Sequence, residues 1–118
     1  MSKYPEIEKR WFSCVEFLTS MTREESEDVL NGLYEKYNEK HRYWHTLKHI
    51  NDMLFGLNKY RDLICSDLKM HMIELAIFFH DFIYVPYKKD NEEESVYYFK
   101  QMICNKIKPL FGNNIELV

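Results

Sequence analysis

The sequence predicts an all-α fold, a bundle of about five helices in one domain that covers residues 1–118. Glycine and proline are scarce, with three of each, whereas all-β folds need many of the turns that these residues favour. Apolar residues recur at spacings of three and four, which is typical of helices that bury one face. Hydrophobic residues make up 46% of the chain, which is enough for one packed core.

The first two expected helices have clear start signals. Pro5 suits the first turn of a helix over about residues 5–18. The buried stripe of this helix is expected to comprise Ile7, Trp11, Cys14, Val15 and Leu18. Thr22 and Glu25 have the spacing of a capping box, so a second helix is expected to begin at about Thr22 and to continue to residue 37.

The third and fourth expected helices flank the residues of chemical interest. Apolar positions at helical spacing predict a third helix over about residues 44–60. A fourth is expected over about residues 66–84, with Ser66 or Asp67 as its N-cap. From Ile73 onward this helix is apolar nearly all round, which predicts a place at the centre of the bundle.

The fifth helix is expected over about residues 91–107. Pro86 begins a loop that separates it from the fourth helix. Asp90 or Asn91 can cap the new helix, and the acidic residues 92–94 lie near its positive end. The chain is therefore expected to consist of consecutive helices joined by short connections.

Charge and composition exclude several classes of protein. The net charge is −3 and no basic patch dominates, so sequence-specific binding of nucleic acid is not expected. No apolar run approaches the roughly 18 residues of a membrane span, so no membrane partner is expected. Cys14, Cys65 and Cys104 do not have metal-ligand spacing, and the first ten residues are charged and contain no apolar run like that of a signal peptide. We therefore expect reduced thiols in a cytoplasmic protein.

His80 and Asp81 are two ionisable residues in the most hydrophobic expected helix. A buried carboxylate without a partner is costly, so a compensating group is expected. A divalent metal ion would serve, because aspartate supplies negative charge and neutral histidine supplies a nitrogen ligand. Alternatively, Asp81 caps a neighbouring helix or pairs with Arg42, and His80 is a hydrogen-bonded core residue.

Three further histidines, His41, His45 and His49, precede the third helix or lie in it. His45 and His49 are four residues apart and share a helical face, an arrangement that recurs at metal sites. The zinc-protease motif is absent, because Thr46 stands where its glutamate would be. The alternatives are a polar surface without a ligand, and a structural zinc site on these three histidines alone.

Together these segments resemble the HD superfamily, and within it the predicted metal-dependent HD-type phosphohydrolases. The matching stretches are HRYWHTLKHINDML at 41–54 and ELAIFFHDFIYVPYKKDNEEESV at 74–96. They contain a His-x-x-x-His-Ile pattern, an apolar segment with Phe-His-Asp, and an Asn-Glu-x-x-Ser sequence. The resemblance implies an HD-like all-α domain with a metal site between helices. It also implies hydrolysis of a phosphate ester or nucleotide by metal-activated water.

The resemblance also implies roles for individual residues. His49, His80 and Asp81 would be ligands of a divalent ion, either Mn, Fe, Co, Ni or Zn. His45 would be a further ligand, or would lie beside the substrate. The expected catalytic residues are Asp81, Glu92 and Glu93, because a carboxylate near the activated water can act as a base or orient it. The expected substrate-binding residues are Arg42, Lys48 and His45.

The chain departs from the family pattern at one ligand. HD enzymes close the site with a later aspartate, whereas Asp90 is the only aspartate after Asp81. We therefore expect residues 1–118 to be the N-terminal portion of a longer domain. The alternative is a non-catalytic helical binding or regulatory module with an incomplete HD site. An apolar face left uncovered would favour a homo-oligomer.

Overall fold

The computed structural model describes residues 4–86 and 88–111 and confirms the all-α prediction. Its α-helices are α1 (Pro5–Leu18), α2 (Arg23–Tyr37), α3 (Leu47–Asn58), α4 (Arg61–Ile64), α5 (Asp67–Phe79) and α6 (Asn91–Met102). Two 3-10 turns follow, η1 (Cys104–Lys106) and η2 (Pro109–Phe111). Among the described residues the only β-type pairing is one isolated bridge between Thr19 and Ile107.

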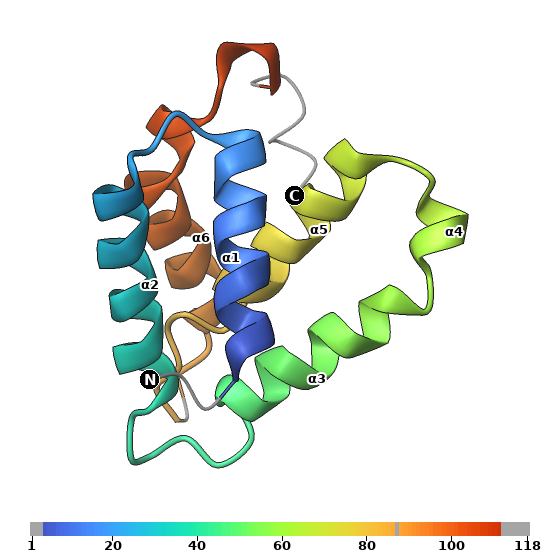
Figure 1. The fold of residues 1–118 in the computed structure, drawn as a ribbon. Coiled ribbons are helices and arrows are strands. Elements are labelled where there is room, and N and C mark those ends of the chain that lie inside the picture. The colour runs from blue at the N-terminus through green and yellow to red at the C-terminus, as the bar shows by residue number, and fades with distance from the viewer. Residues whose placement is uncertain (1–3, 87, 112–118) are drawn as a thin grey trace.

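Helix α1 runs through the middle of the bundle, with α2 beside it and α5 crossing behind it (Figure 1). Its packing against α5 is the most extensive between any two helices. All five residues of the expected apolar stripe are buried. Trp11 is fully buried and meets the Phe78 ring edge-on, with ring centroids 5.2 Å apart. The predicted apolar face of the first helix is therefore correct.

Helix α2 begins with the predicted capping box. The Glu25 amide donates to the Thr22 hydroxyl at 3.1 Å, and the Thr22 amide donates to the Glu25 carboxylate at 2.9 Å. This exchange satisfies two backbone donors that the first turn of a helix leaves without partners. The buried face of α2 presents Leu30, Leu33 and Tyr37 to the core.

A buried ion pair links three helices. Arg10 of α1 donates from Nε to the Glu74 carboxylate of α5 at 2.7 Å. Its Nη1 atom donates to the Leu54 carbonyl and to the Asn58 side chain of α3, both at 2.8 Å. The side chains of Arg10 and Glu74 are only 10% and 6% exposed, respectively. This contact fixes α3 and α5 against α1.

The expected start of the third helix was wrong. Helix α3 begins at Leu47, and Tyr43 and Trp44 lie in the preceding loop with 78% and 73% of their surfaces exposed. The sequence also did not predict the short helix α4 between α3 and α5. Cys65 ends α4 in the left-handed conformation, with φ of 51°, which breaks the helical path.

The expected ends of the fourth and fifth helices were also wrong. Helix α5 begins after the N-cap Ser66, as expected, but ends at Phe79, so residues 80–85 form a turn. Phe82 and Ile83 belong to that turn, and their side chains are buried. The apolar pattern therefore continues past the end of the helix, which is why the sequence predicted a longer one. Helix α6 begins at Asn91, as expected, but ends at Met102 and is followed by η1.

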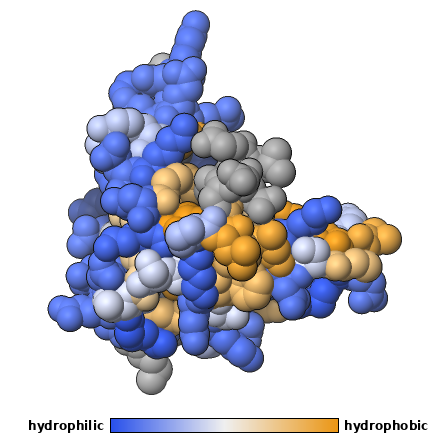
Figure 2. Space-filling view, turned by 90° about the horizontal axis from the view of Figure 1, so that it is seen from above, coloured by the Kyte–Doolittle hydropathy of each residue, from blue (hydrophilic) through white to orange (hydrophobic). Residues whose placement is uncertain are grey.

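Apolar side chains also gather on the surface where α4 projects from the bundle (Figure 2). Leu63 of α4 is 80% exposed, and Phe55 of α3 is 53% exposed. Coverage of an apolar surface by a second copy of the chain stays a prediction. None of the described helices is long and apolar enough to cross a membrane.

Candidate metal centre

Three side chains from the resembling segments converge at one place. His49 comes from α3, and His80 and Asp81 come from the turn that follows α5. One potential ligand atom from each lies within 4.8 Å of those of the other two. All three residues are partly exposed, so the group is accessible from solvent. Two imidazole nitrogens and one carboxylate oxygen form a donor set that divalent transition metals favour.

His80 and Asp81 are consecutive residues, yet their side chains meet at the end of α5. Neighbouring side chains on a regular helix project about 100° apart, which would separate His80 from Asp81. His80 is the C-cap of α5, and Asp81 lies in the turn beyond it. His80 Nε2 nevertheless lies 3.1 Å from Asp81 Oδ2.

A backbone contact fixes the orientation of the His80 ring. Its Nδ1 atom lies 2.7 Å from the Ile77 carbonyl oxygen, which can only accept a hydrogen bond. Nδ1 therefore carries a proton, and Nε2 faces Asp81, to which it donates a hydrogen bond when the ring is protonated. Burial alone would lower the pKa of His80, but the hydrogen bonds to Asp81 and to the Ile77 carbonyl outweigh it and raise this pKa.

Asp81 is held as an ionised carboxylate. Burial by itself would raise its pKa, because it disfavours the charged form. Hydrogen bonds from His80 and His45 outweigh burial and hold the pKa of Asp81 well below its usual range. A carboxyl group must be ionised in this way to serve as a metal ligand.

His45 lies beside Asp81 and outside the group of three candidate ligands. Its Nδ1 atom is 2.8 Å from Asp81 Oδ2, and its ring stacks on Tyr84 with centroids 4.1 Å apart. The sequence left two roles open, a metal ligand or a residue near the substrate. The structure places His45 where it orients the Asp81 carboxylate.

Arg42 is buried, and its guanidinium is used within the protein. It donates to the backbone carbonyls of Asp81 and Phe82, both at 2.7 Å, and to the Glu39 carboxylate at 2.9 Å. These bonds attach the loop before α3 to the turn that carries His80 and Asp81. Arg42 was expected to contact phosphate, whereas the structure shows it holding the backbone of the candidate site.

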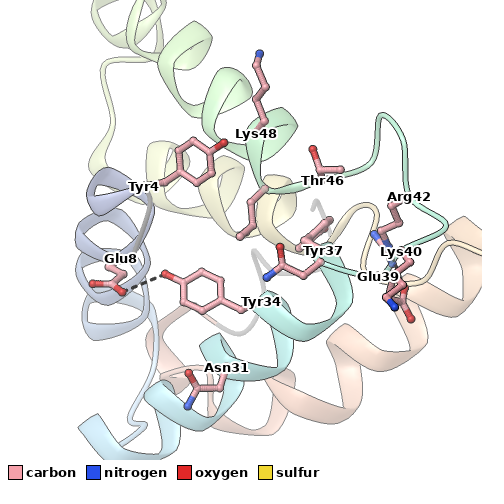
Figure 3. A pocket seen from close by; sticks show the side chains of 12 residues that line it. Tyr4, Glu8, Asn31, Tyr34, Tyr37, Glu39, Lys40, Arg42, Thr46 and Lys48 are labelled. Atoms are coloured by element: carbon pink, nitrogen blue, oxygen red, sulfur yellow. Dashed lines mark hydrogen bonds and ion pairs between the residues drawn. The ribbon is translucent and has the colours of Figure 1, made fainter. Parts of the chain in front are cut away.

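Lys48 lines a hollow to which His80 and Asp81 do not contribute. Its side chain is exposed and pairs with Asp52 at 2.8 Å. Lys48, Arg42 and Thr46 line a polar hollow of about 720 Å³, together with tyrosines of α2 (Figure 3). Tyr34 in this hollow donates to Glu8 at 3.3 Å. The structure thus separates Lys48 from the hollow that contains His80 and Asp81.

The acidic start of α6 brings one carboxylate to the candidate site. Glu92 lines a hollow with His80 and Asp81, and its negative charge contributes to the raised pKa of His80. Glu93 is exposed and does not line this hollow. The sequence offered both glutamates as candidates, and the structure brings Glu92 to the site.

Asn91 and Ser95 hold the turn of residues 80–85 through hydrogen bonds to its backbone. The sequence did not suggest this role for them. The Ser95 hydroxyl accepts a hydrogen bond from the Ile83 amide at 2.9 Å. The Asn91 side chain accepts from the Val85 amide at 3.1 Å and donates to the Val85 carbonyl at 3.2 Å. Asn91 and Ser95 are four residues apart and share a helical face. This spacing could have indicated that both side chains contact the same neighbouring segment.

No family model, curated protein or solved structure matches this chain. The interpretation of the site therefore depends on the geometry of its residues and on the resemblance of its motifs.

Proposed function

We propose that this chain is an HD-type metal-dependent phosphohydrolase, and that His49, His80 and Asp81 hold its divalent ion. The observation that carries the proposal is the convergence of these three ligand atoms within 4.8 Å, although His49 is 31 positions before His80 in the sequence. They are the same three residues that the HD resemblance designates as ligands.

The donor set fits the ion that the proposal requires. Neutral imidazole and ionised carboxylate suit Mn, Fe, Co, Ni or Zn, and relative affinity alone does not choose among them. A bound divalent ion would lower the pKa of water and offset the negative charge of a phosphate ester or nucleotide. The Ile77 carbonyl already orients the His80 ring for such a ligand role.

The neighbouring residues position the reacting groups. His45 holds the Asp81 carboxylate, and Arg42 holds the backbone on which Asp81 stands. Glu92 is the carboxylate that shares the hollow with His80 and Asp81, so it can accept a proton from water or orient it. A phosphate ester enters from the solvent-exposed side of this hollow.

A non-catalytic metal-binding module is the second candidate. Among the described residues this group supplies three ligands, whereas the HD pattern includes a further aspartate. A three-ligand site can bind a metal ion without supporting hydrolysis. Metal content and hydrolysis therefore have to be measured on the same preparations.

The test is the metal content of the purified protein by inductively coupled plasma mass spectrometry, beside His80→Ala and Asp81→Ala variants. His41→Ala is the matched control, because His41 lies near the site but does not belong to the converging group. We expect near-stoichiometric metal that is lost in the first two variants and kept in the control. Metal that survives in Asp81→Ala and disappears in His41→Ala would favour a site on the three earlier histidines.

Hydrolysis is then measured with a panel of phosphate esters and nucleotides, using the metal that the protein retains. Hydrolysis that disappears in Asp81→Ala supports the phosphohydrolase. Stoichiometric metal without hydrolysis of any ester supports the non-catalytic module. Hydrolysis at the wild-type rate in Asp81→Ala would refute the proposed mechanism.

A further inference from the structure

The hollow beside His80 and Asp81 is mainly apolar beyond its metal-binding end. Its volume is about 390 Å³, within the range of small-molecule sites. Helix α5 contributes Ala76 and Phe79, and helix α6 contributes Val96 and Phe99. A hollow that combines apolar walls with a few convergent polar groups is the usual form of a ligand site.

The two phenylalanines form the floor of this hollow. Phe79 and Phe99 meet edge to face, with ring centroids 5.3 Å apart, and both are largely buried. The Ala76 and Val96 side chains line the hollow beside these rings and offer surface to an apolar group. Val96 is 51% exposed, so its side chain lies at the open side of the hollow.

The two ends of the hollow differ in charge, because Glu92 and Lys100 of α6 lie at opposite ends. Glu92, Val96 and Lys100 are four residues apart in turn and so lie along one face of the helix. Glu92 lies at the end with His80, and Lys100 is two turns away, roughly 12 Å along the helix axis. The apolar surface therefore lies between the candidate metal ligands and Lys100.

We infer that the substrate is a phosphate monoester whose alcohol part is an apolar ring or chain. This inference rests on the proposed function and specifies its substrate class. The phosphate lies at the His80–Asp81 end, and the apolar part lies over Phe79 and Phe99 beside Val96. A polyhydroxylated alcohol such as glycerol would lose hydrogen bonds to water there without equivalent partners on the apolar walls.

The experiment compares benzyl phosphate with glycerol 1-phosphate as substrates of the metal-loaded protein. Both esters release a primary alcohol, so their intrinsic reactivities are similar. We expect kcat/KM for the benzyl ester to be at least about tenfold higher, because the ring leaves water for an apolar wall. Equal values for the two esters would overturn the inference and leave the phosphohydrolase proposal standing.

A pair of variants on α6 tests whether the hollow causes the preference. Val96→Asn places a polar amide in the apolar wall, and we expect it to abolish most of the tenfold preference. Tyr97→Asn is the matched control, since Tyr97 is the next residue, is also exposed and does not line the hollow. Loss of the preference in Tyr97→Asn, or its retention in Val96→Asn, would contradict the inference.

Binding separates this inference from the proposed function. If no ester of the panel is hydrolysed, these two included, the phosphohydrolase proposal fails, and benzylphosphonate binding is measured by nuclear magnetic resonance. Saturable binding that perturbs the Ala76 and Val96 methyl signals and weakens in Val96→Asn supports the apolar subsite. Absence of binding overturns it. A dimer that Val96→Asn converts to a monomer would also overturn it, because a second chain would then cover the hollow.

Discussion

Loss of the buried partner of Arg10 is expected to destabilise the whole bundle. The guanidinium joins α1 to Glu74 of α5 and to Leu54 and Asn58 of α3 through bonds of 2.7 to 2.8 Å. Replacing Glu74 with leucine leaves the Arg10 charge without its counter-ion, in a position where only 10% of its side chain is exposed. Removal of one partner of a buried pair costs about 3–5 kcal/mol.

That loss is large beside the roughly 5–15 kcal/mol that holds a domain of this kind in its folded state. Urea denaturation followed by circular dichroism measures it. Glu27→Leu is the matched control, because Glu27 pairs with Arg23 on an exposed face of α2. We expect this control to change the free energy of unfolding by at most about 0.5 kcal/mol.

The double variant Arg10→Met/Glu74→Leu tests the cause of the destabilisation. If the uncompensated charge is responsible, removal of both charges should restore part of the stability that Glu74→Leu loses. A double variant whose loss equals the sum of the two single losses would refute this reasoning. So would a loss below about 1 kcal/mol in Glu74→Leu, because buried pairs are expected to cost several times more.

Four further predictions follow from single contacts. Ser66→Ala removes the N-cap of α5 and should lower the free energy of unfolding by about 1 kcal/mol in urea denaturation. Ser95→Ala leaves the buried Ile83 amide without its acceptor, which should cost about 1–3 kcal/mol and speed hydrogen exchange at that amide. Burial raises the pKa of Tyr37, so stability should fall as the pH rises above the unfolded value of about 10, by up to about 1.4 kcal/mol per pH unit. In the Tyr37→Phe variant, the free energy of unfolding measured by denaturation at pH values above about 10 should fall less steeply with pH. His45→Ala frees the Asp81 carboxylate and should weaken metal binding roughly 10–100-fold in a competition titration with a chelator.

The sequence predicted those helices whose signals are local. The apolar stripe of α1 and the capping box of α2 each depend on residues within one helix, and both are present as expected. The end of α5 depends on residues from elsewhere in the chain. Phe82 and Ile83 are as buried in a turn as they would be in a helix, so apolar spacing could not distinguish the two conformations.

The sequence singled out the three converging residues of the candidate site, but not the contacts of their surroundings. Spacing and resemblance selected His49, His80 and Asp81, and the structure brings their ligand atoms together. The contacts of Arg42 could not be foreseen, because the carbonyls that it binds belong to a turn 39 and 40 residues away. Helical phase could have preferred Glu92 to Glu93, since only Glu92 is three and seven residues before the buried Ser95 and Phe99.

Two separate segments fix the turn that carries the candidate ligands. Arg42 binds the carbonyls of Asp81 and Phe82 from one side, and Ser95 binds the Ile83 amide from the other. The backbone groups of this turn are not part of the regular hydrogen bonding of α5. Those that are buried therefore need other partners. The Asn-Glu-x-x-Ser sequence therefore combines two tasks on one helical end: Asn91 and Ser95 hold the turn, and Glu92 reaches the hollow beside the ligands. The spacing of this motif follows from the geometry of the helix. Asn91 and Ser95 are one helical turn apart and so reach the same turn, whereas Glu92 projects in another direction, toward the hollow.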